Sequence, residues 1–280
     1  MIELSIRDYM VTDYPFIDKN ETLYHAFKIM EKYGFDKAVI YEHKVDSSGH
    51  EYKALAGILT CRDIVSKLAT QRLRLTTPGR LHVSSFMSFN PVYAPIDTPI
   101  ESIARTMYEK RIGIIPVLED HSVVGVVLRE KILDLLRNDD REVRHIMNTE
   151  PLVVRTSDRL LKVKQDMLAS DSSYAVVLDE RNDIIGYITI VELAYAFFKF
   201  QDIVPAKHKK ERIMHLIVED VMRHRPVKLR ITDTVATAYS SIMERGCRGV
   251  VVVDEIGGLA GVITVHDLLE YLVREKLSIR

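Results

Sequence analysis

Cysteine is scarce in this sequence, where Cys61 and Cys247 are the only two among 280 residues. Two cysteines cannot form a disulfide framework, so a reducing cytoplasm is the expected compartment. No basic segment followed by an apolar one opens the chain, and we therefore expect no signal peptide. The longest apolar stretch, residues 184–198, contains Glu192 and is shorter than the roughly 20 residues of a membrane span. These absences indicate a soluble protein without a membrane partner.

The sequence also lacks an excess of charge of either sign, because 39 Lys and Arg residues face 40 Asp and Glu residues and the net charge is −1. No global field favours nucleic acid, which we do not expect as a partner. The chain contains no Walker loop, no dinucleotide-binding glycine fingerprint and no Ser-His-Asp order, so nothing indicates an enzyme. A composition that is 47% hydrophobic and 28% charged is typical of globular domains.

A seven-residue stretch recurs four times and organises the chain. Its complete form, at residues 261–267, has glycine, two aliphatic residues, threonine and, three residues later, aspartate. We interpret it as the end of a strand, a turn and the start of a helix, with glycine admitting another backbone or a ligand. The other copies occupy residues 57–63, 125–131 and 186–192. The first and fourth copies are complete, whereas the second and third are altered.

A methionine precedes each copy at a nearly constant distance. Met10, Met87, Met147 and Met222 lie 47, 38, 39 and 39 residues before the motif glycines. Three nearly equal spacings indicate a repeated structural unit. The larger first spacing predicts an enlarged hairpin loop at residues 43–50.

Between these two landmarks every copy has the same order of predicted elements. An extended piece containing proline follows the methionine, and apolar residues at helical spacing then predict a helix. The helices are expected at residues 23–30, 100–107, 160–167 and 235–242. A strand is expected next, at residues 37–41, 114–118, 174–178 and 250–253. The unit is β-α-β-β-α and is too small to bury a stable core alone, so we expect the units to pair.

The landmarks and their spacing resemble the cystathionine β-synthase (CBS) domain family over nearly the whole chain. The resemblance implies an α/β (α+β) fold of four β-α-β-β-α CBS repeats, paired into two Bateman modules with pseudo-two-fold symmetry. The layout is similar to that of stand-alone archaeal CBS proteins and of the γ subunit of AMP-activated protein kinase. We expect the repeats at residues 1–68, 81–137, 141–199 and 216–276, and the modules at residues 1–137 and 141–280.

The resemblance also implies a function. Repeats of this family bind adenine nucleotides (AMP, ADP or ATP), or less often S-adenosylmethionine, in clefts between paired repeats, and no cofactor is required. We therefore expect a regulatory, energy-sensing protein that is not an enzyme. It would signal its ligand state to an unidentified protein effector through rearrangement of its modules. A homodimer formed by stacked modules is a further expectation.

The chemistry of the motif suits a nucleotide. A carboxylate accepts hydrogen bonds from the two cis hydroxyls of a ribose, and a threonine hydroxyl at a helix start suits a phosphate. The alternative is that the aspartate only caps its own helix. For Arg62 and Arg248, the alternative to a phosphate contact is an ordinary exposed position. The predicted ligand-binding residues of the complete motifs are Gly57, Ile58, Thr60, Arg62 and Asp63, together with Arg248, Gly261, Ile263, Thr264 and Asp267.

The altered motifs are weaker candidates. In the second copy Leu128 and Lys131 replace threonine and aspartate, and an ammonium cannot accept from ribose hydroxyls. The alternative there is that Lys131 and Arg129 face a phosphate in the neighbouring cleft. In the third copy Thr189 and Glu192 are both candidate ligand-binding residues, although the extra methylene of Glu192 displaces its carboxylate.

Three further features favour a structural interpretation. Cys61 and Cys247 lie near the proposed sites, but nothing indicates a lowered thiol pKa, so we expect small buried thiols rather than redox sensors. His43 and His50 share a loop without carboxylate or cysteine support, and no metal is expected. The basic run at residues 207–210 is expected to be a solvated helix face or linker, with docking of an acidic partner as the alternative.

Other function classes remain open on sequence alone. A scaffold whose sites have lost their ligand is one alternative, because two of the four motifs are altered. A sensor of S-adenosylmethionine is another. An enzyme has the least support, because the motif acids recur at the repeat spacing and suit ribose binding better than proton transfer.

Overall fold

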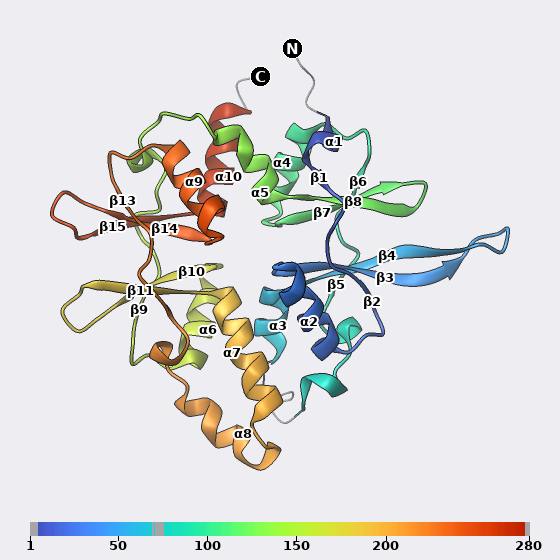
Figure 1. Ribbon diagram of the computed structural model, residues 1–280, viewed down its shortest axis with the longest axis horizontal. Coiled ribbons are helices and arrows are strands. Elements are labelled where there is room, and N and C mark those ends of the chain that lie inside the picture. Colours follow the sequence, from blue (N-terminus) through green and yellow to red (C-terminus); the bar gives the residue numbers. More distant parts are fainter. Residues whose placement is uncertain (1–4, 69, 71–75, 278–280) are drawn as a thin grey trace. The chain divides into compact units, whose positions relative to one another are not determined.

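The computed structural model describes residues 5–68, 70 and 76–277. Residues 1–4 of the first predicted repeat and residues 278–280 of the second predicted module lie outside the described residues. The described chain forms four β-α-β-β-α units, which confirms the predicted α/β fold (Figure 1). None of the helices in this part of the chain is long and apolar enough to cross a membrane.

The first two repeats contain the following elements. Those of the first are α1 (Ile6–Tyr9), β1 (Met10–Val11), β2 (Phe16–Asp18), α2 (Leu23–Tyr33), β3 (Lys37–Val45), β4 (Glu51–Thr60) and α3 (Cys61–Leu68). Those of the second are β5 (Ser88–Phe89), β6 (Ala94–Pro95), α4 (Ile100–Glu109), β7 (Ile114–Glu119), β8 (Ser122–Leu128) and α5 (Arg129–Ile132). Short 3₁₀ turns at Pro78–Arg80 and Val83–Ser85 precede β5, and another at Leu133–Leu136 continues α5.

The last two repeats follow the same order. Those of the third are β9 (Val153–Arg155), α6 (Leu160–Ala169), β10 (Tyr174–Leu178), β11 (Ile184–Thr189) and α7 (Ile190–Ile203), after a 3₁₀ turn at Val143–His145. Helix α8 (Ala206–Arg212) and 3₁₀ turns at Ile213–His215 and Val218–Asp220 connect the third and fourth repeats. Those of the fourth are β12 (Arg223–His224), β13 (Lys228–Arg230), α9 (Val235–Arg245), β14 (Gly249–Val253), β15 (Leu259–Thr264) and α10 (Val265–Tyr271), which continues as a π-helix at Leu272–Lys276.

The long helices form where the apolar spacing predicts them. In α2 the side chain of Thr22 accepts a 3.2 Å hydrogen bond from the amide of His25, and Gly34 ends the helix with φ 70°. Thr234 and Gly246 play the same two roles in α9. Glycine suits such an end because it adopts the left-handed region without steric cost. The apolar positions face the core, and the buried ones are Leu23, Ala26, Phe27, Met30, Ile100, Ile103, Ala104, Met107, Leu160, Val163, Met167, Val235, Ala238, Tyr239 and Ile242.

The chain divides into two compact units. The first comprises Met1–Ile103, Ile114–Leu128 and Ala194–Ile213, and the second comprises Ala104–Gly113, Arg129–Leu193 and Met214–Arg280. The first unit therefore contains the strands of the first and second repeats, together with the C-terminal part of α7 and the whole of α8. The second unit contains the strands of the third and fourth repeats, together with the C-terminal part of α4 and the whole of α5.

In the first unit the two repeats exchange a strand. The sheets have the orders β2-β3-β4-β5 and β1-β8-β7-β6, so β5 of the second repeat completes the sheet of the first and β1 of the first completes that of the second. The two sheets lie one above the other (Figure 1). The two repeats therefore pair by exchanging strands, because neither sheet is complete without a strand from the other repeat. Between the sheets lies a cluster of Val39, Ile58, Ile114, Val126 and Leu128.

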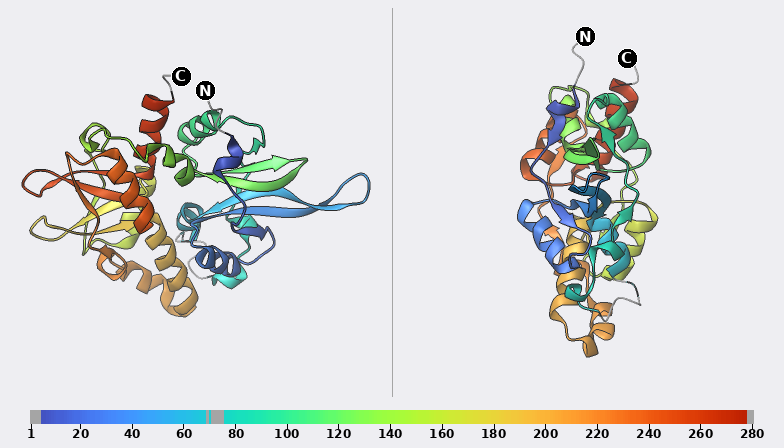
Figure 2. Two further views of the ribbon diagram at one scale, coloured as in Figure 1. Left: turned by 45° about the horizontal axis from the view of Figure 1, so that its top comes forward. Right: turned by 90° about the vertical axis from the view of Figure 1, so that its right-hand side faces the viewer.

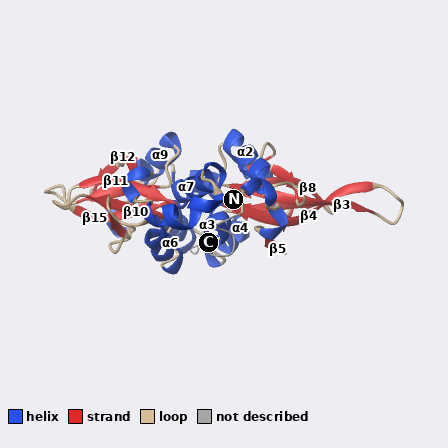
Figure 3. Ribbon diagram, turned by 90° about the horizontal axis from the view of Figure 1, so that it is seen from below, coloured by secondary structure: helices blue, strands red, loops and turns tan. Residues whose placement is uncertain are grey.

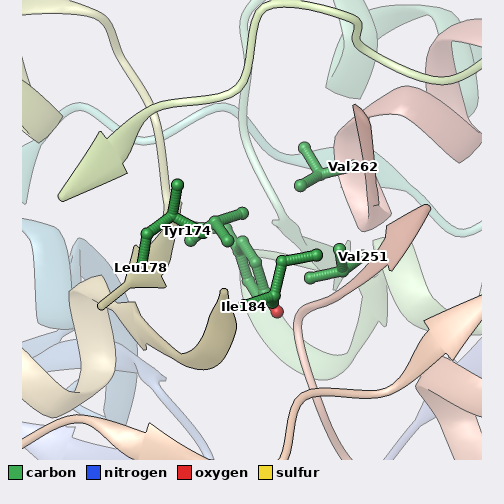
Figure 4. Packing of buried hydrophobic residues seen from close by; sticks show 6 residues of the cluster. Tyr174, Leu178, Ile184, Val251 and Val262 are labelled. Atoms are coloured by element: carbon green, nitrogen blue, oxygen red, sulfur yellow. The ribbon is translucent and has the colours of Figure 1, made fainter. Parts of the chain in front are cut away.

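The second unit repeats this exchange. Its first sheet has the order β12-β11-β10-β9, with β12 contributed by the fourth repeat, and its second has the order β13-β14-β15. Asn148 of the third repeat bridges Val262 of β15 and so takes the place of the exchanged strand. Figure 4 shows the core between these sheets, whose buried members are Tyr174, Val176, Leu178, Ile184, Val251 and Val262.

The segment between the second and third repeats is anchored on the end of the fourth. Asp139 is buried, and its Oδ2 accepts hydrogen bonds from the Tyr271 hydroxyl at 3.0 Å and from Lys276 Nζ at 2.7 Å. Its Oδ1 accepts from the amide of Arg141 at 3.0 Å. Burial alone would raise the pKa of Asp139, but the hydrogen bonds from Lys276, the Arg141 amide and Tyr271 hold it below its ordinary value. This carboxylate therefore fastens the connecting segment in its ionised form.

Two details differ from the sequence predictions. The hairpin loop predicted at residues 43–50 is confined to residues 46–50, because β3 continues to Val45 and β4 begins at Glu51. The additional residues lengthen the hairpin, which extends beyond β8 in Figure 2 and Figure 3. In the basic run, Lys209 is fully buried and its Nζ donates a 2.6 Å hydrogen bond to the carbonyl of Gln201. That face of α8 is therefore only partly solvated.

Candidate functional site

The motif glycines face the landmark methionines of the paired repeat. A Cβ atom on Gly261 would lie 2.5 Å from the carbonyl oxygen of Asn148, and one on Gly57 would lie 2.7 Å from that of Ser88. Such distances leave room only for glycine. The close approach predicted at Gly57 and Gly261 is thus made by the chain itself. The methionines in contact are Met87 at Gly57, Met10 at Gly125, Met222 at Gly186 and Met147 at Gly261.

The first motif holds its carboxylate between two repeats. Thr60 donates to Asp63 Oδ2 from its amide at 2.8 Å and from its hydroxyl at 2.6 Å. The amide of Asp63 in turn donates to the Thr60 hydroxyl at 3.1 Å, which completes a cap on α3. The second oxygen, Oδ1, accepts a 3.2 Å hydrogen bond from the hydroxyl of Ser88, which β5 brings from the second repeat.

The fourth motif has the same cap but leaves one carboxylate oxygen available. Thr264 donates to Asp267 Oδ2 from its amide and its hydroxyl, both at 2.7 Å. No side chain in the described part of the chain donates to Asp267 Oδ1. Burial raises the pKa of the Asp267 carboxyl above its ordinary value, although the two bonds from Thr264 act in the opposite direction. Asp267 is half-buried, and its second carboxylate oxygen thus lacks a side-chain donor that would stabilise its charge.

The third motif reproduces the cap with a longer side chain. Glu192 Oε2 accepts from the amide of Thr189 at 3.1 Å and from the Thr189 hydroxyl. The extra methylene therefore does not prevent the carboxylate from reaching the motif threonine. Glu192 Oε1 lies 3.1 Å from Nε of Arg223, which β12 brings from the fourth repeat.

The second motif contributes a cation to the fourth. Leu128 is buried and Lys131 is exposed. Burial lowers the pKa of His266, and the positive charges of Arg111 and Arg129 lower it further. Arg129 therefore acts on the residue that directly precedes Asp267. The alternative in which Arg129 faces a phosphate in the neighbouring cleft stays a prediction, and Lys131 lies on the surface.

Polar and aromatic groups surround His266 within the second unit. The rings of Tyr108 and His266 stack with centroids 6.0 Å apart. The Tyr108 hydroxyl donates to Glu270 at 3.3 Å and accepts from Arg274 at 2.7 Å. These contacts place α4 of the second repeat against the helix that carries Asp267.

The remaining predicted residues lie at or near the two complete motifs. Ile58 faces the core between the sheets of the first unit, where it packs with Val126. Ile263 is fully buried, but side chains alternate along a strand, so Val262 rather than Ile263 is the counterpart of Ile58. Arg62 is half-buried in the first turn of α3.

Arg248 and Cys247 precede β14 beside the start of α10. The carbonyl of Arg248 accepts a 3.2 Å hydrogen bond from the amide of Val265. Burial raises the pKa of the Cys247 thiol, and neither Cys247 nor Cys61 forms a disulfide. A raised pKa keeps the thiol protonated and unreactive at neutral pH. Of the two thiols expected to be buried, Cys61 is buried and Cys247 is only half-buried.

Other candidate features lie away from the motifs. An open hollow of about 630 Å³ in the second unit is lined by Asp140, Arg141, Glu142 and His145, none of which belongs to a motif. Within the described residues, no group of three or more His, Cys, Asp or Glu side chains could hold a metal ion.

A family model identifies the repeats. The model described as "CBS domain" matches residues 6–70, 83–138, 143–199 and 218–274. The chain belongs to the CBS domain family. The predicted recognition of four CBS repeats arranged in Bateman modules is thus confirmed. CBS-domain proteins are generally regulatory rather than catalytic, and this chain is a regulatory protein of that family.

Three similar proteins extend the likeness over most of the CBS chain. An uncharacterized 33.4 kDa protein in a ribosomal RNA operon of Thermofilum pendens is 23% identical over 240 residues, which are 81% of this chain and 79% of that protein. Protein MJ1225 from Methanocaldococcus jannaschii, proposed to be an archaeal homologue of g-AMPK, has a TM-score of 0.80 at 16% identity, covering 96% of this chain and 100% of that one. A conserved protein from Pyrococcus horikoshii has a TM-score of 0.61 at 14% identity, with 96% and 100% covered. At these identities the solved structures show a shared fold.

Several residues beside the CBS motifs were not predicted from the sequence. Ser88 and Arg223 reach the carboxylates because each follows a landmark methionine and lies on an exchanged strand. Their position directly after the landmark methionine is a sequence signal that could have identified both residues. Arg111 and Tyr108 carry no such signal, because they approach His266 only through the packing of α4.

Proposed function

We propose that this protein is a regulatory sensor that binds adenine nucleotides (AMP, ADP or ATP) at its two complete motifs. One site is built on Thr60 and Asp63 in the first unit, and the other on Thr264 and Asp267 in the second. Ligand-binding roles for the glycines, for Arg62 and for Arg248 belong to the same proposal. It requires no cofactor and no catalytic step.

The single observation that carries this proposal is the state of Asp267. Its half-buried carboxylate is held by Thr264 through one oxygen, while the other has no side-chain donor among the described residues. A ribose presents two adjacent hydroxyls that can donate to such an oxygen. A hydrogen bond to a charged acceptor contributes about 1.5–3 kcal/mol. The apolar residues that follow the motif glycines, Ile58 and Val262, are suited to a purine.

The charges around the fourth motif favour a phosphate over a sulfonium. The positive charges of Arg111 and Arg129 act on His266, next to Asp267 and at the start of α10, and the negative charges of Glu270 and Asp171 act against them. Arg111 is also ion-paired with Asp171. A nucleoside phosphate gains from these cations and from the N-terminus of the helix. S-adenosylmethionine carries a positive sulfonium and is repelled by the same groups. This argument favours a nucleotide over the alternative of an S-adenosylmethionine sensor.

Titration calorimetry with AMP, ADP, ATP, adenosine and S-adenosylmethionine tests the proposed function. We expect binding heat with the three nucleotides, weaker binding of adenosine and none of S-adenosylmethionine. No heat with any of the five compounds would leave a scaffold with degenerate sites as the function. Tighter binding of S-adenosylmethionine than of AMP would reverse the choice of ligand.

Signalling follows from differential affinity. A nucleotide shifts the equilibrium between module arrangements toward the arrangement that binds it better. The free energy of this shift cannot exceed the difference in binding free energy between the arrangements. We propose that the modules at residues 1–137 and 141–280 rearrange in this way and that a cytoplasmic protein effector detects the change. A homodimer through stacked modules belongs to the same proposal, and light scattering with and without AMP measures its mass.

A further inference from the structure

The residue after each landmark methionine lies opposite the motif of the paired repeat. In the second unit Arg223 pairs across the sheet with Tyr187, the residue that follows the motif glycine of the third repeat. The same register holds in the other three copies. The corresponding pairs are Ser88 with Ile58, Val11 with Val126 and Asn148 with Val262. We refer to Val11, Ser88, Asn148 and Arg223 as the gate residues.

Two gate residues place no charge on a motif carboxylate. At the first motif the Ser88 hydroxyl donates a 3.2 Å hydrogen bond to Asp63 Oδ1, which is a neutral contact. At the fourth motif the side-chain oxygen of Asn148 accepts from the amide of Glu150 at 2.9 Å and is used within its own turn. A ligand hydroxyl can therefore replace or join these groups without breaking an ion pair. Val11 faces the second motif, which has Lys131 in place of the motif carboxylate.

The gate residue of the third motif is a cation. Arg223 Nε lies 3.1 Å from Glu192 Oε1, while Oε2 accepts both donors of Thr189. Both oxygens of this carboxylate are therefore engaged, one of them by a positive charge. The side chain of Glu192 is 13% exposed, so water screens its charge little.

Aromatic rings cover the apolar side of the same motif. Tyr187 stacks on Tyr174, with ring centroids 5.2 Å apart and planes inclined by 7°. Tyr174 is 1% exposed and belongs to the core cluster of Figure 4. Because the two facing ring surfaces cover each other, a purine cannot insert between Tyr174 and Tyr187 without separating them.

We infer that Arg223 closes the third motif to nucleotides, so that the second unit binds one nucleotide, at Asp267. This inference rests on the proposed function and adds the residue that sets its stoichiometry. Arg223 supplies to Glu192 the donor that a ribose hydroxyl supplies to Asp267, and a guanidinium holds a carboxylate more strongly than a neutral hydroxyl does. The length of Glu192 is not the obstacle, because Thr189 binds it as Thr264 binds Asp267.

The number of AMP molecules bound per chain tests the role of Arg223. Arg223→Ser gives the third motif the gate residue of the first, and Arg223→Lys is the matched control because it keeps a cation beside Glu192. The Arg223 side chain is 66% exposed, so both variants should fold like the parent. Native mass spectrometry and calorimetry should show two AMP for the parent and for Arg223→Lys, and three for Arg223→Ser. Arg223→Thr serves as a second small hydroxyl variant if Arg223→Ser folds poorly.

The two hypotheses fail in different ways. One additional AMP on Arg223→Ser relative to the parent supports the closing role of Arg223, whatever number the parent binds. Equal numbers on the two proteins overturn it. A parent that binds no AMP overturns the proposed function, and the comparison with Arg223→Ser then still decides whether Arg223 closes the third motif.

Discussion

Thr264 donates two hydrogen bonds to one oxygen of Asp267, from its amide and from its hydroxyl, both at 2.7 Å. These bonds cap α10 and fix the carboxylate, yet they leave its second oxygen available. On sequence alone, capping and ligand binding are competing interpretations of the motif aspartate. The geometry makes them compatible, because each function uses a different oxygen of the same side chain.

We expect Asp267→Asn to keep the fold and to lose the nucleotide response of the fourth motif. The asparagine oxygen can still accept from Thr264, but N–H donors then stand where a carboxylate oxygen accepted. The pKa of Asp267 is higher in the folded state than in the unfolded state. Its ionisation therefore lowers the free energy of unfolding as the pH rises through the folded-state pKa. At pH 7 the ligand-free variant should therefore melt at the same temperature as the parent or higher.

Thermal unfolding with and without AMP measures this effect. The double variant Asp63→Asn/Asp267→Asn should show no stabilisation by AMP, and each single variant should keep part of it. Full stabilisation in the double variant would rule out both carboxylates as the nucleotide contacts.

We expect Arg129→Gln to weaken AMP binding at the fourth motif about tenfold, to leave the site at the first motif unchanged and to leave adenosine binding unchanged. Arg129 acts on His266 beside the fourth motif, and one charge-assisted contact to a phosphate accounts for roughly 1.4 kcal/mol, or tenfold in Kd. Lys131→Gln is the matched control, because Lys131 is exposed. Calorimetry with both ligands provides the comparison, and an equal loss for AMP and adenosine would exclude a phosphate contact.

Gly261→Ala should destabilise the second unit by about 2–3 kcal/mol, within the range of overpacked cores. Its Cβ would meet the backbone carbonyl of Asn148 at 2.5 Å, and the segment at Asn148 would have to move. Gly79→Ala is the control, because a Cβ there meets no atom within 4 Å. Urea unfolding measures both variants. Gly125→Ala should cost less, since the nearest atoms belong to the flexible side chain of Met10.

Asp139→Asn should destabilise the protein by about 1–2 kcal/mol at pH 7, because it removes the charge that pairs with Lys276. The folded-state pKa of Asp139 lies below its unfolded value, so its contribution is present above the unfolded pKa and is lost as the pH falls through the folded one. The difference between parent and variant should therefore shrink below about pH 4. The exposed neighbour provides a control in Asp140→Asn. Urea unfolding across this pH range shows whether the difference follows that course.

Local patterns predicted the elements that depend on local physics. The spacing of Leu23, Ala26 and Met30 placed α2, and a glycine after the last apolar turn ended it. The hairpin at residues 43–50 was predicted as a loop because its polar residues give no strand periodicity. There β3 and β4 continue through pairing with each other, from Tyr41 opposite Leu55 to Val45 opposite Glu51. Pairing between the two strands therefore extends the hairpin where local sequence preference predicts a loop.

The sequence by itself determined the four repeats, their order of elements and the threonine–carboxylate caps, because these arise from periodicity and from contacts within three or four residues. Only the tertiary structure decided what faces each carboxylate. Ser88 is 25 residues from Asp63 and Arg223 is 31 residues from Glu192, and both arrive on exchanged strands. The register of those strands is set by burial between two sheets, which no single repeat can establish alone.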